Sequence, residues 1–482
     1  MLKQLATGNF SSSGYYFWEN IKKISKMGES FMEKFFKLKE NGTDVKREVV
    51  GGLITFLTMA YIIAVNANML GDPGVGMDPG AVVTATCLAA GVTTILMGLY
   101  ANLPLGLASG MGLNAFFAFN VVMGMGISWQ VALTAVFVEG IIFIVLSLTK
   151  VREAIVNCIP ANLKYAVTAG IGLFIAFIGF ANAGIVVADP ATKVAMGNLL
   201  SPTVLIAVLG IVIIVVLSKK GVKGAILWGI AGSALAAWGF ALINPEAAAE
   251  MMIFLPDGIF EYKSISPVLF KLDFSVFGNG SALAEFMTVV FTFLFVDFFD
   301  TAGTLVGVAS KIGMVDEEGR VKNAGKALLV DAIGTTFGAM VGTSTVTTYV
   351  ESSAGVAAGA RTGLSAVVTG VLFLLAMFLA PLFIAIPGCA TAPALIIVGF
   401  FMMDAVRKIN FEDFTEGVPA FLTIALMPLT YSIGDGLMIG MLSYAVLNFI
   451  PNLLSKAEER KKVSGVIYIL AVVFIAKIIF IP

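Results

Sequence analysis

Phe291-Thr-Phe-Leu-Phe-Val-Asp-Phe-Phe-Asp-Thr-Ala-Gly-Thr-Leu-Val-Gly-Val308 is an apolar run with the length of a membrane-spanning helix, yet it contains Asp297 and Asp300. A carboxylate at the centre of a bilayer costs at least about 2.5–3.5 kcal/mol on insertion scales, and acids that remain there usually serve a substrate or an ion. Glu351 stands in a second such stretch, Gly342-Thr-Ser-Thr-Val-Thr-Thr-Tyr-Val-Glu-Ser-Ser-Ala-Gly355. These two stretches predict both a membrane fold and its functional site.

The composition predicts a helical membrane protein. Of 482 residues, 58% are hydrophobic and 13% are charged, whereas soluble domains are about 25% charged. Apolar segments of about 20 residues recur along the chain, as expected for helices and not for the shorter strands of a membrane barrel. The net charge of −1 gives no electrostatic reason to expect nucleic acid as a partner.

The chain has no histidine, and its three cysteines stand at unrelated spacings. We therefore expect no metal and no cofactor, and any proton chemistry must use carboxylates. Residues 1–48 form a polar, lysine-rich tail without a long apolar core, so we expect no cleavable signal peptide. Met32 offers a second start to the chain, after Met1.

Hydropathy predicts fourteen membrane spans. They cover residues 49–70, 80–100, 106–125, 129–148, 160–183, 201–218, 222–243, 283–308, 324–342, 343–359, 362–382, 387–405, 417–431 and 435–454. A further apolar stretch at 465–481 contains Lys477, and it either crosses the membrane or lies at its surface.

The basic residues predict the orientation. If the amino terminus is cytoplasmic, 26 of the 30 Lys and Arg fall in cytoplasmic segments, as the positive-inside rule requires. A missed or invented span in the middle would remove this bias, because every later loop would change side. We therefore expect a multi-pass protein of the cell (plasma or inner) membrane with a cytoplasmic amino terminus.

The two halves of the chain resemble one another. Residues 87–98 in the second span are similar to residues 329–338 in the ninth, and an Ile-Pro pair opens both the fifth and the twelfth span. Seven spans is an odd number, so the second copy must insert upside down, as in the inverted repeats of secondary transporters. The expected organisation is a tail (1–48), a first repeat (49–243), an external linker (244–281), a second repeat (282–455) and a carboxy-terminal segment (456–482).

The third and tenth segments are rich in Gly or in Thr and Ser, and they occupy corresponding positions in the two repeats. Leu105-Gly-Leu-Ala-Ser-Gly-Met-Gly-Leu-Asn114 and Gly342-Thr-Ser-Thr-Val-Thr-Thr-Tyr-Val350 are too short to span as regular helix. Paired, interrupted segments of this kind indicate a binding site at the membrane midplane. Each is expected to be part short β-strand and part helix, with the amino-terminal end of the helix directed at the site.

Four polar residues form one stripe if the eighth span is helical, since Asp297, Asp300, Thr301 and Thr304 are spaced i, i+3, i+4 and i+7. Two acids and two hydroxyls can hold a polar, uncharged ligand that has N–H donors, because carboxylates accept such bonds strongly. The alternative is that the acids only tie interrupted backbone to neighbouring helices.

Glu351 follows the extended stretch where the next helix should begin, so it either binds a ligand or proton or caps that helix. Asn114, with Ser109 in the third segment, either contacts the substrate through its amide or caps a helix. Asp331 is expected to be structural, and a buried hydrogen-bonding role is open for Glu139.

Several motifs resemble the azaguanine-type purine permeases, a branch of the nucleobase–cation symporter family with the uracil-permease fold. The similarity runs from about residue 33 to 455. The motifs are Gly42-Thr-Asp-Val-Lys-Arg-Glu-Val49, Gly110-Met-Gly-Leu-Asn-Ala-Phe-Phe117, Val296-Asp-Phe-Phe-Asp-Thr-Ala-Gly-Thr-Leu-Val-Gly307 and Gly342-Thr-Ser-Thr-Val-Thr-Thr-Tyr-Val-Glu-Ser-Ser-Ala-Gly-Val356. In this branch a proline often stands where the chain has Ser109.

The resemblance implies a core domain of spans 1–4 and 8–11 and a gate domain of spans 5–7 and 12–14. It also implies import of adenine, guanine and hypoxanthine by proton symport, with no enzymatic activity. The essential acids of the family map to Asp297 and Glu351, and an asparagine of the third span maps to Asn114. The other expected site residues are Thr301, Phe116, Phe117 and Val350 for the substrate and Asp300 for the proton.

Two other functions remain open at this stage. An anion transporter of the sulfate-permease type would share the implied fold, although the expected pocket segments contain no Lys or Arg. A channel or a membrane enzyme is a further alternative, although no nucleophile–base arrangement or metal cluster is visible. The choice between H⁺ and Na⁺, the preferred purine and the formation of a homodimer are not decided by the sequence.

Overall fold

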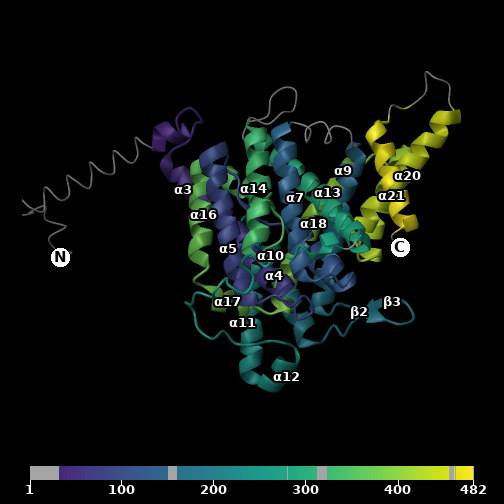
Figure 1. Ribbon diagram of the computed structural model, residues 1–482. Coiled ribbons are helices and arrows are strands. Elements are labelled where there is room, and N and C mark those ends of the chain that lie inside the picture. The colour runs from purple at the N-terminus through teal and green to yellow at the C-terminus, as the bar shows by residue number, and fades with distance from the viewer. Residues whose placement is uncertain are drawn as a thin grey trace, which may run out of the picture.

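The computed structural model describes residues 32–149, 160–278, 280–311, 323–454, 461 and 463–480, and within these ranges it is a bundle of roughly parallel and antiparallel helices (Figure 1). The first half contains α3 (Val45–Met59), α4 (Tyr61–Leu70), α5 (Pro79–Leu96), η1 (Met97–Ala101), β1 (Leu107–Ser109), α6 (Met111–Ala115), η2 (Phe116–Gly124), α7 (Trp129–Thr149), α9 (Ala161–Ala183), β2 (Val186–Asp189), β3 (Lys193–Met196), α10 (Pro202–Lys219) and α11 (Ala225–Ile243). The linker contains α12 (Pro245–Glu250) and η3 (Ser275–Gly278).

The second half repeats the pattern. It contains α13 (Gly280–Lys311), α14 (Ala324–Val341), β4 (Val346–Thr348), α15 (Ser352–Ala357), α16 (Gly363–Ala376), α17 (Ala380–Ile384), α18 (Gly388–Met402), η4 (Met403–Lys408), α19 (Phe414–Leu429), α20 (Ile433–Leu454) and α21 (Gly465–Phe480). Nine helical segments of the described residues are long and apolar enough to cross a membrane. The expected fold class, an all-helical polytopic membrane protein, is confirmed, whereas the count of fourteen spans stays a prediction.

The structure differs from the predicted spans at several boundaries. The first span begins at Val45, because the Asp44 side chain accepts a hydrogen bond of 2.9 Å from the Arg47 N–H and caps α3. This span is also interrupted at Ala60, between α3 and α4. The β2–β3 hairpin, with Asp189 opposite Lys193, was not expected. These features depend on local caps and turns that a hydropathy window averages out.

The strands predicted for the third and tenth segments are present and pair with one another. β1 and β4 are antiparallel, with Leu107 opposite Thr348 and Ser109 opposite Val346. The ladder continues at both ends, where the Gly110 N–H donates to the Thr345 carbonyl (2.9 Å) and the Tyr349 N–H to the Gly106 carbonyl (3.0 Å). Each half of the chain therefore supplies one strand, and the helical segments α6 and α15 leave the pair in opposite directions.

Small residues allow the helices to pack closely, as in many membrane bundles. A Cβ atom at Gly363 in α16 would lie 2.0 Å from the carbonyl oxygen of Gly98 in η1. A Cβ atom at Gly399 in α18 would lie 2.3 Å from the carbonyl oxygen of Gly172 in α9. Larger side chains at these positions would force the helices apart.

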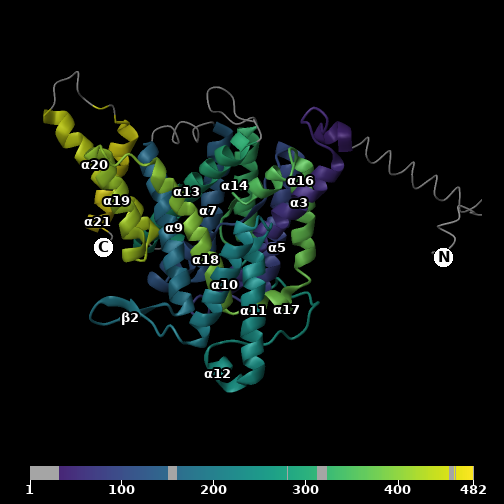
Figure 2. The ribbon, with the colours of Figure 1, turned by 180° about the vertical axis from the view of Figure 1, so that it is seen from behind.

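Two groups of helices pack mainly among themselves. In the first, α14 packs on α7, and α16 packs on α5 and α3. In the second, α9 packs on α18 and α19, while α10 and α11 pack on each other and on α18. Figure 2 shows the second group from its own side, with α9, α18, α10 and α11 in front.

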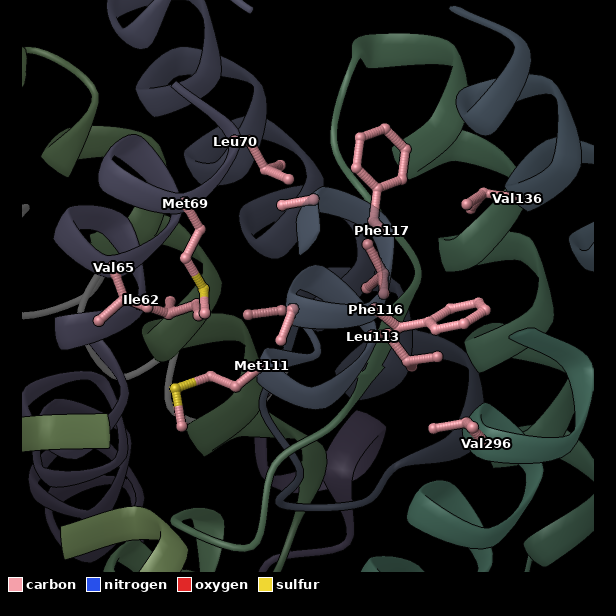
Figure 3. Close-up of a cluster of buried hydrophobic side chains, with 14 of the residues drawn as sticks. Ile62, Val65, Met69, Leu70, Met111, Leu113, Phe116, Phe117, Val136 and Val296 are labelled. Atoms are coloured by element: carbon pink, nitrogen blue, oxygen red, sulfur yellow. The ribbon is translucent and has the colours of Figure 1, made fainter. Parts of the chain in front are cut away.

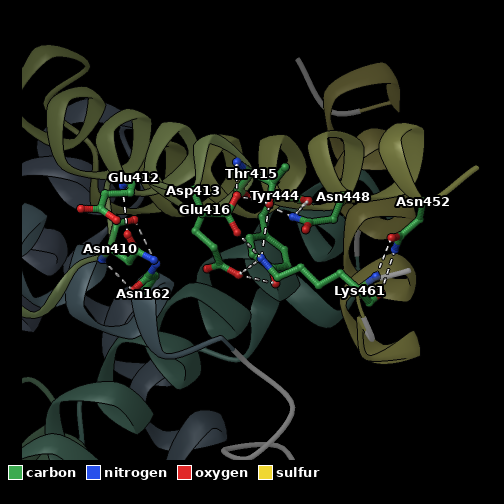
Figure 4. Close-up of polar contacts among 10 residues, drawn as sticks. All are labelled: Asn162, Asn410, Glu412, Asp413, Thr415, Glu416, Tyr444, Asn448, Asn452 and Lys461. Atoms are coloured by element: carbon green, nitrogen blue, oxygen red, sulfur yellow. Dashed lines mark hydrogen bonds and ion pairs between the residues drawn. The ribbon is translucent and has the colours of Figure 1, made fainter. Parts of the chain in front are cut away.

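Helix α21 is held against the bundle by polar contacts at Lys461 (Figure 4). The Lys461 ammonium lies 3.0 Å from a carboxylate oxygen of Asp413 and 2.5 Å from a carboxylate oxygen of Glu416. Both acids lie near the start of α19. The Asn452 side chain pairs with the backbone N–H and carbonyl of Lys461 at 2.8 Å each. Within α21, Phe474 packs edge-on against Phe291 of α13. The side chain of Lys477 lies outside the described residues.

Glu48 in α3 fastens the start of α16. Its carboxylate is fully buried and accepts hydrogen bonds from the N–H groups of Arg361 (2.7 Å), Thr362 (3.2 Å) and Ser365 (3.2 Å). Replacement Glu48→Gln leaves one acceptor oxygen for these donors, so we expect the free energy of unfolding to fall by about 1–3 kcal/mol. Thermal unfolding of the purified protein measures the change. The exposed Glu40→Gln is the control, and equal midpoints for the two variants would contradict the assigned role.

The Lys461 contacts should depend on pH. The Thr415 hydroxyl, donating to Asp413 at 2.8 Å, lowers the pKa of that carboxyl. Burial opposes this, and Lys461 adds to the lowering. A carboxyl whose pKa is lowered by folding stabilises the fold above its unfolded pKa, and this stabilisation is lost as the pH falls through the folded value. We expect Lys461→Met to cost up to about 1 kcal/mol at pH 7 and progressively less below about pH 4.

Thermal unfolding of Lys461→Met at a series of pH values tests this prediction. Arg407→Met is the matched control, because its ion pair with Asp404 joins two exposed side chains. A Lys461→Met effect that is equal at pH 7 and pH 3 would show that the ion pairs do not hold α21.

Candidate functional site

The β1–β4 pair places polar side chains in the middle of the bundle. The Thr94 hydroxyl of α5 donates to the Leu107 carbonyl (3.0 Å) and accepts from the Leu107 N–H (2.8 Å). The Thr335 hydroxyl of α14 donates to the Val346 carbonyl (3.0 Å). The residues of both strands are buried. Threonines from both repeats thus complete the hydrogen bonding of backbone that is not helical.

Asp297 lies next to this pair through Thr301, one turn further along α13. Thr301 lies 3.3 Å from an Asp297 oxygen, 3.0 Å from both Asp331 oxygens and 2.7 Å from the Thr347 hydroxyl of β4. All four side chains are buried. Since Thr301 has one proton to donate, this network has several alternative arrangements of its hydrogen bonds.

Glu351 directly precedes α15, but its carboxylate does not cap that helix. It accepts a hydrogen bond of 2.6 Å from the Tyr61 hydroxyl at the start of α4. Its neighbour Val350 is 55% exposed, in contrast to the buried strand residues before it. The capping role that the sequence left open for Glu351 is therefore not observed, and the acid stands at the border between packed and open space.

Asn114 also does not cap its helix, since it lies inside α6, whose cap position is Gly110. Its amide donates to the Asn66 side chain of α4 at 2.5 Å and accepts from the Ser109 hydroxyl at 2.6 Å. Asn66 in turn donates to the Thr86 hydroxyl at 2.9 Å. Asn114 is thus held by α4 and β1, and its contact with a substrate stays a prediction.

The aromatic residues expected to contact a ligand lie on η2 (Figure 3). Phe116 packs edge-on against Phe293 of α13 with ring centroids 4.9 Å apart, and Phe117 lies 6.4 Å from the same ring. Phe117 is fully buried, whereas Phe116 retains slight exposure and lines a cavity. Of the two, Phe116 has the position from which a ring could cover a ligand.

A hydrogen bond joins the two segments that carry the principal acids. Thr347 stands four residues before Glu351, and its hydroxyl bonds to Thr301, four residues after Asp297. The carboxylates themselves have different partners, an alcohol for Asp297 and a phenol for Glu351. The side chain of Asp300 lies outside the described residues, so its expected proton role is untested.

Asp331, which was expected to be structural, and Glu139, for which a buried hydrogen-bonding role was open, are both buried and hydrogen-bonded. Glu139 of α7 accepts from the Thr345 hydroxyl at 2.9 Å, just before β4. Asp331 of α14 shares Thr301 with Asp297 and so belongs to the same network.

The sequence reasoning missed Tyr61 and Asn66. A tyrosine and an asparagine in the first span were the available signal, although nothing in their spacing connects them to residues more than 40 positions away.

The hydrogen bonds described at the site, among the residues that the structure describes, come from uncharged groups. Asp297 pairs with the Thr301 hydroxyl, Glu351 with the Tyr61 phenol and Asn114 with the Asn66 amide. In the same part of the chain, no three Cys, Asp or Glu side chains are arranged to hold a metal ion. Chemically, the arrangement suits a neutral ligand with N–H donors better than an anion.

The chain is similar to known permeases over nearly its whole length. The chain is 42% identical to the adenine permease AdeP of Escherichia coli, covering 94% of this chain and 97% of that protein. It is 46% identical to the guanine/hypoxanthine permease PbuG of Bacillus subtilis, covering 93% of this chain and 100% of that protein. The transmembrane domain of the cyanobacterial bicarbonate transporter BicA has a similar fold, with a TM-score of 0.61 at 16% identity over 82% of this chain and 96% of that one.

The sequence profile of the Permease family matches residues 46–439, which include both strands, Asp297 and Glu351. This match and the relatives above agree with the resemblance seen in the motifs, and they identify a multi-pass membrane protein that is not an enzyme. The chain belongs to the Permease family.

Proposed function

We propose that the protein imports purine nucleobases (adenine, guanine and hypoxanthine) by proton symport with alternating access. The observation that carries the proposal is the identity of 42–46% to named adenine and guanine/hypoxanthine permeases over nearly the full length of the chain. Proteins this similar share their fold throughout, and the buried Asp297 and the partly buried Glu351 supply the acceptors that a neutral purine needs.

A purine would bind between the β1–β4 pair and α13. Asp297 and Glu351 would accept its ring N–H groups, with Thr301 as a further hydrogen-bonding group and Val350 and Phe116 as apolar contacts. Asn114, through Ser109 and Asn66, would fix the shape of the third segment and stay within reach of the ligand. Phe117, fully buried in this structure, would reach the ligand only after a rearrangement of η2.

The proton would bind to Glu351, with Asp297 and Asp300 as further acids on its path. The Glu351 carboxylate is hydrogen-bonded to an uncharged phenol, so a proton can bind without breaking an ion pair. One proton moving down about 100 mV releases about 2.3 kcal/mol, which supports roughly 50-fold accumulation of a neutral substrate.

Alternating access would come from the two groups of helices rocking against each other. The group of α3–α7 and α13–α17 would be the core domain, and the group of α9–α11 and α18–α20 the gate domain.

In this arrangement the amino terminus is cytoplasmic and the cell (plasma or inner) membrane is the location. A homodimer would fix the gate domains while the cores move.

Anion transport is the alternative that a specific observation favours. BicA, a bicarbonate transporter, and the anion transporter Slc26a9 of mouse have this fold, with TM-scores of 0.61 and 0.58. Their identities of 16% and 10% support the fold alone. An anion site needs positive charge, and the described contacts of the candidate site are made by neutral groups.

Uptake into vesicles tests the proposal. We expect labelled hypoxanthine, adenine or guanine to accumulate when the outside is made acidic, and uracil, sulfate and bicarbonate to compete poorly. The rate should follow the pH gradient and be unchanged when Na⁺ is replaced by K⁺. Uptake blocked by sulfate or bicarbonate and not by purines would replace the proposal with the anion alternative.

Replacement of Glu351 tests the proton pathway. Glu351→Gln keeps the size of the side chain and removes the ionisable group, so we expect accumulation to fall from up to about 50-fold to equilibration, while exchange of base across the membrane continues. Glu285→Gln is the control, because it makes the same replacement of a carboxylate by an amide near the start of α13. Accumulation at the wild-type level in Glu351→Gln would exclude this residue as the proton carrier.

A further inference from the structure

The cavity that Phe116 lines extends beside the candidate site, and of the residues in its wall the proposed function uses Phe116 alone. Its volume is about 240 Å³, and it lies between η2, α13 and the turn that leads into α20. Its wall includes Phe116, Asn120, Thr288, Thr292, Ser432 and Asp435. We call this space the Asn120 cavity. Pockets for drug-sized molecules measure about 300–1,000 Å³, so the Asn120 cavity suits a smaller ligand, such as one bicyclic ring.

The Asn120 cavity is separate from the acids but adjoins them. On α13, Thr292 lies five residues before Asp297, and Thr288 lies nine residues before Asp297. These separations correspond to about 8 and 14 Å along the helix axis. Phe116 lines the cavity and also packs against Phe293, one turn from Asp297. A ligand in the cavity would therefore be separated from the site of the acids by the pair of phenyl rings.

Asn120 carries the chemical argument. Its Nδ2 donates to the Tyr431 carbonyl, whereas its Oδ1 is buried with no hydrogen-bond partner among the described residues. A buried acceptor left without a partner costs about 1–3 kcal/mol, and such groups are rare in folded proteins. After a small local rearrangement that opens this oxygen to the cavity, an N–H donor of a ligand would satisfy it, and the hydroxyls of Thr288, Thr292 and Ser432 can both donate and accept.

The residues over the cavity hold it in shape. Tyr431 has a left-handed backbone (φ 55°), and its ring packs edge-on against Phe119, Phe174 and Phe177. Gly434 faces the opposite wall, where a Cβ atom would lie 3.3 Å from the Thr292 methyl carbon. The phenylalanine rings around Tyr431 therefore fix one side of the turn before α20. On the other side, Gly434 has no side chain and so leaves the cavity open.

We propose that the Asn120 cavity is a second binding subsite for the nucleobase, occupied on the path to the acids, with Asn120 Oδ1 accepting a ring N–H and Phe116 contacting the ring. This inference rests on the proposed function. The cavity lies where η2 and α19 end, opposite the Lys- and Arg-rich loops, so in the expected orientation it faces outside. The hydroxyl, amide and aromatic groups of the wall suit a neutral heterocycle, and the carboxylate of Asp435 in the same wall disfavours an anion.

Equilibrium binding to the purified full-length protein tests the subsite, with the base that the wild type accumulates best among adenine, guanine and hypoxanthine as the labelled probe. We expect two molecules bound per chain. Thr288→Leu, which fills the cavity, should bind one, with the affinity of the remaining site unchanged. Thr292→Val, which removes a hydroxyl at constant shape, should weaken the second site by about tenfold.

Matched controls use threonines that, like Thr288 and Thr292, donate to the carbonyl four residues before them. These are Thr149→Leu at the exposed end of α7 and Thr168→Val in α9. Both should bind two molecules, and unchanged unfolding midpoints would show that all four variants fold. A Thr288→Cys variant gives an independent readout, because the base should protect it from a water-soluble thiol reagent, and Thr149→Cys should not be protected.

One molecule bound per chain in both the wild type and Thr288→Leu, with no protection of Thr288→Cys, would overturn the subsite and leave the proposed function intact. Absence of both binding and uptake for every base in the wild type would overturn the proposed function itself, and the subsite with it.

Discussion

The hydrogen-bonded pairing of β1 with β4 is the constraint on which the rest of the structure depends. Non-helical backbone in the middle of an apolar bundle must find partners within the protein, because no water is available there. Pairing Leu107 with Thr348 and Ser109 with Val346 satisfies part of this need, and Thr94 and Thr335 satisfy more. Since the strands come from different halves of the chain, neither half can complete its own midplane segment. The two halves of the chain are thus joined at the strands beside which the candidate site lies.

The same hydroxyl groups connect this structural requirement to the candidate chemistry. Thr347 belongs to β4, yet its hydroxyl contacts Thr301, which also lies within hydrogen-bond distance of Asp297 and Asp331. The density of Thr and Ser in residues 342–353 therefore has two causes, the needs of the backbone and the positioning of the acids. A change in the protonation or ligation of Asp297 would be felt by the strand pair through a single hydroxyl, which gives the site a direct connection to the arrangement of the two repeats.

Much of the fold could be predicted from the sequence because its signals are local. The Thr- and Val-rich stretch at 346–348 predicts a strand, and the acids within apolar runs predict the site. Tyr61 and Asn66 could not be found in this way, because their partners lie 290 and 48 residues away and only the folded helices bring them together. The open choice between capping and ligand binding at Glu351 also needed the structure, since it depends on where the carboxylate points. The β2–β3 hairpin lies between spans, where hydropathy carries no information.

The different surroundings of the two acids argue for different tasks. Asp297 is fully buried and lies beside Thr301, whose other neighbours are Asp331 and Thr347, so its position is determined from several sides. Glu351 borders the exposed Val350 and has a phenol as its hydrogen-bond donor. A group that must exchange a proton with water needs access and a partner that tolerates both of its charge states, and a tyrosine hydroxyl can donate to a carboxylate or accept from a carboxylic acid. Glu351 has such a partner, which agrees with its proposed proton role, whereas the better-fixed Asp297 is suited to holding a ligand in one orientation.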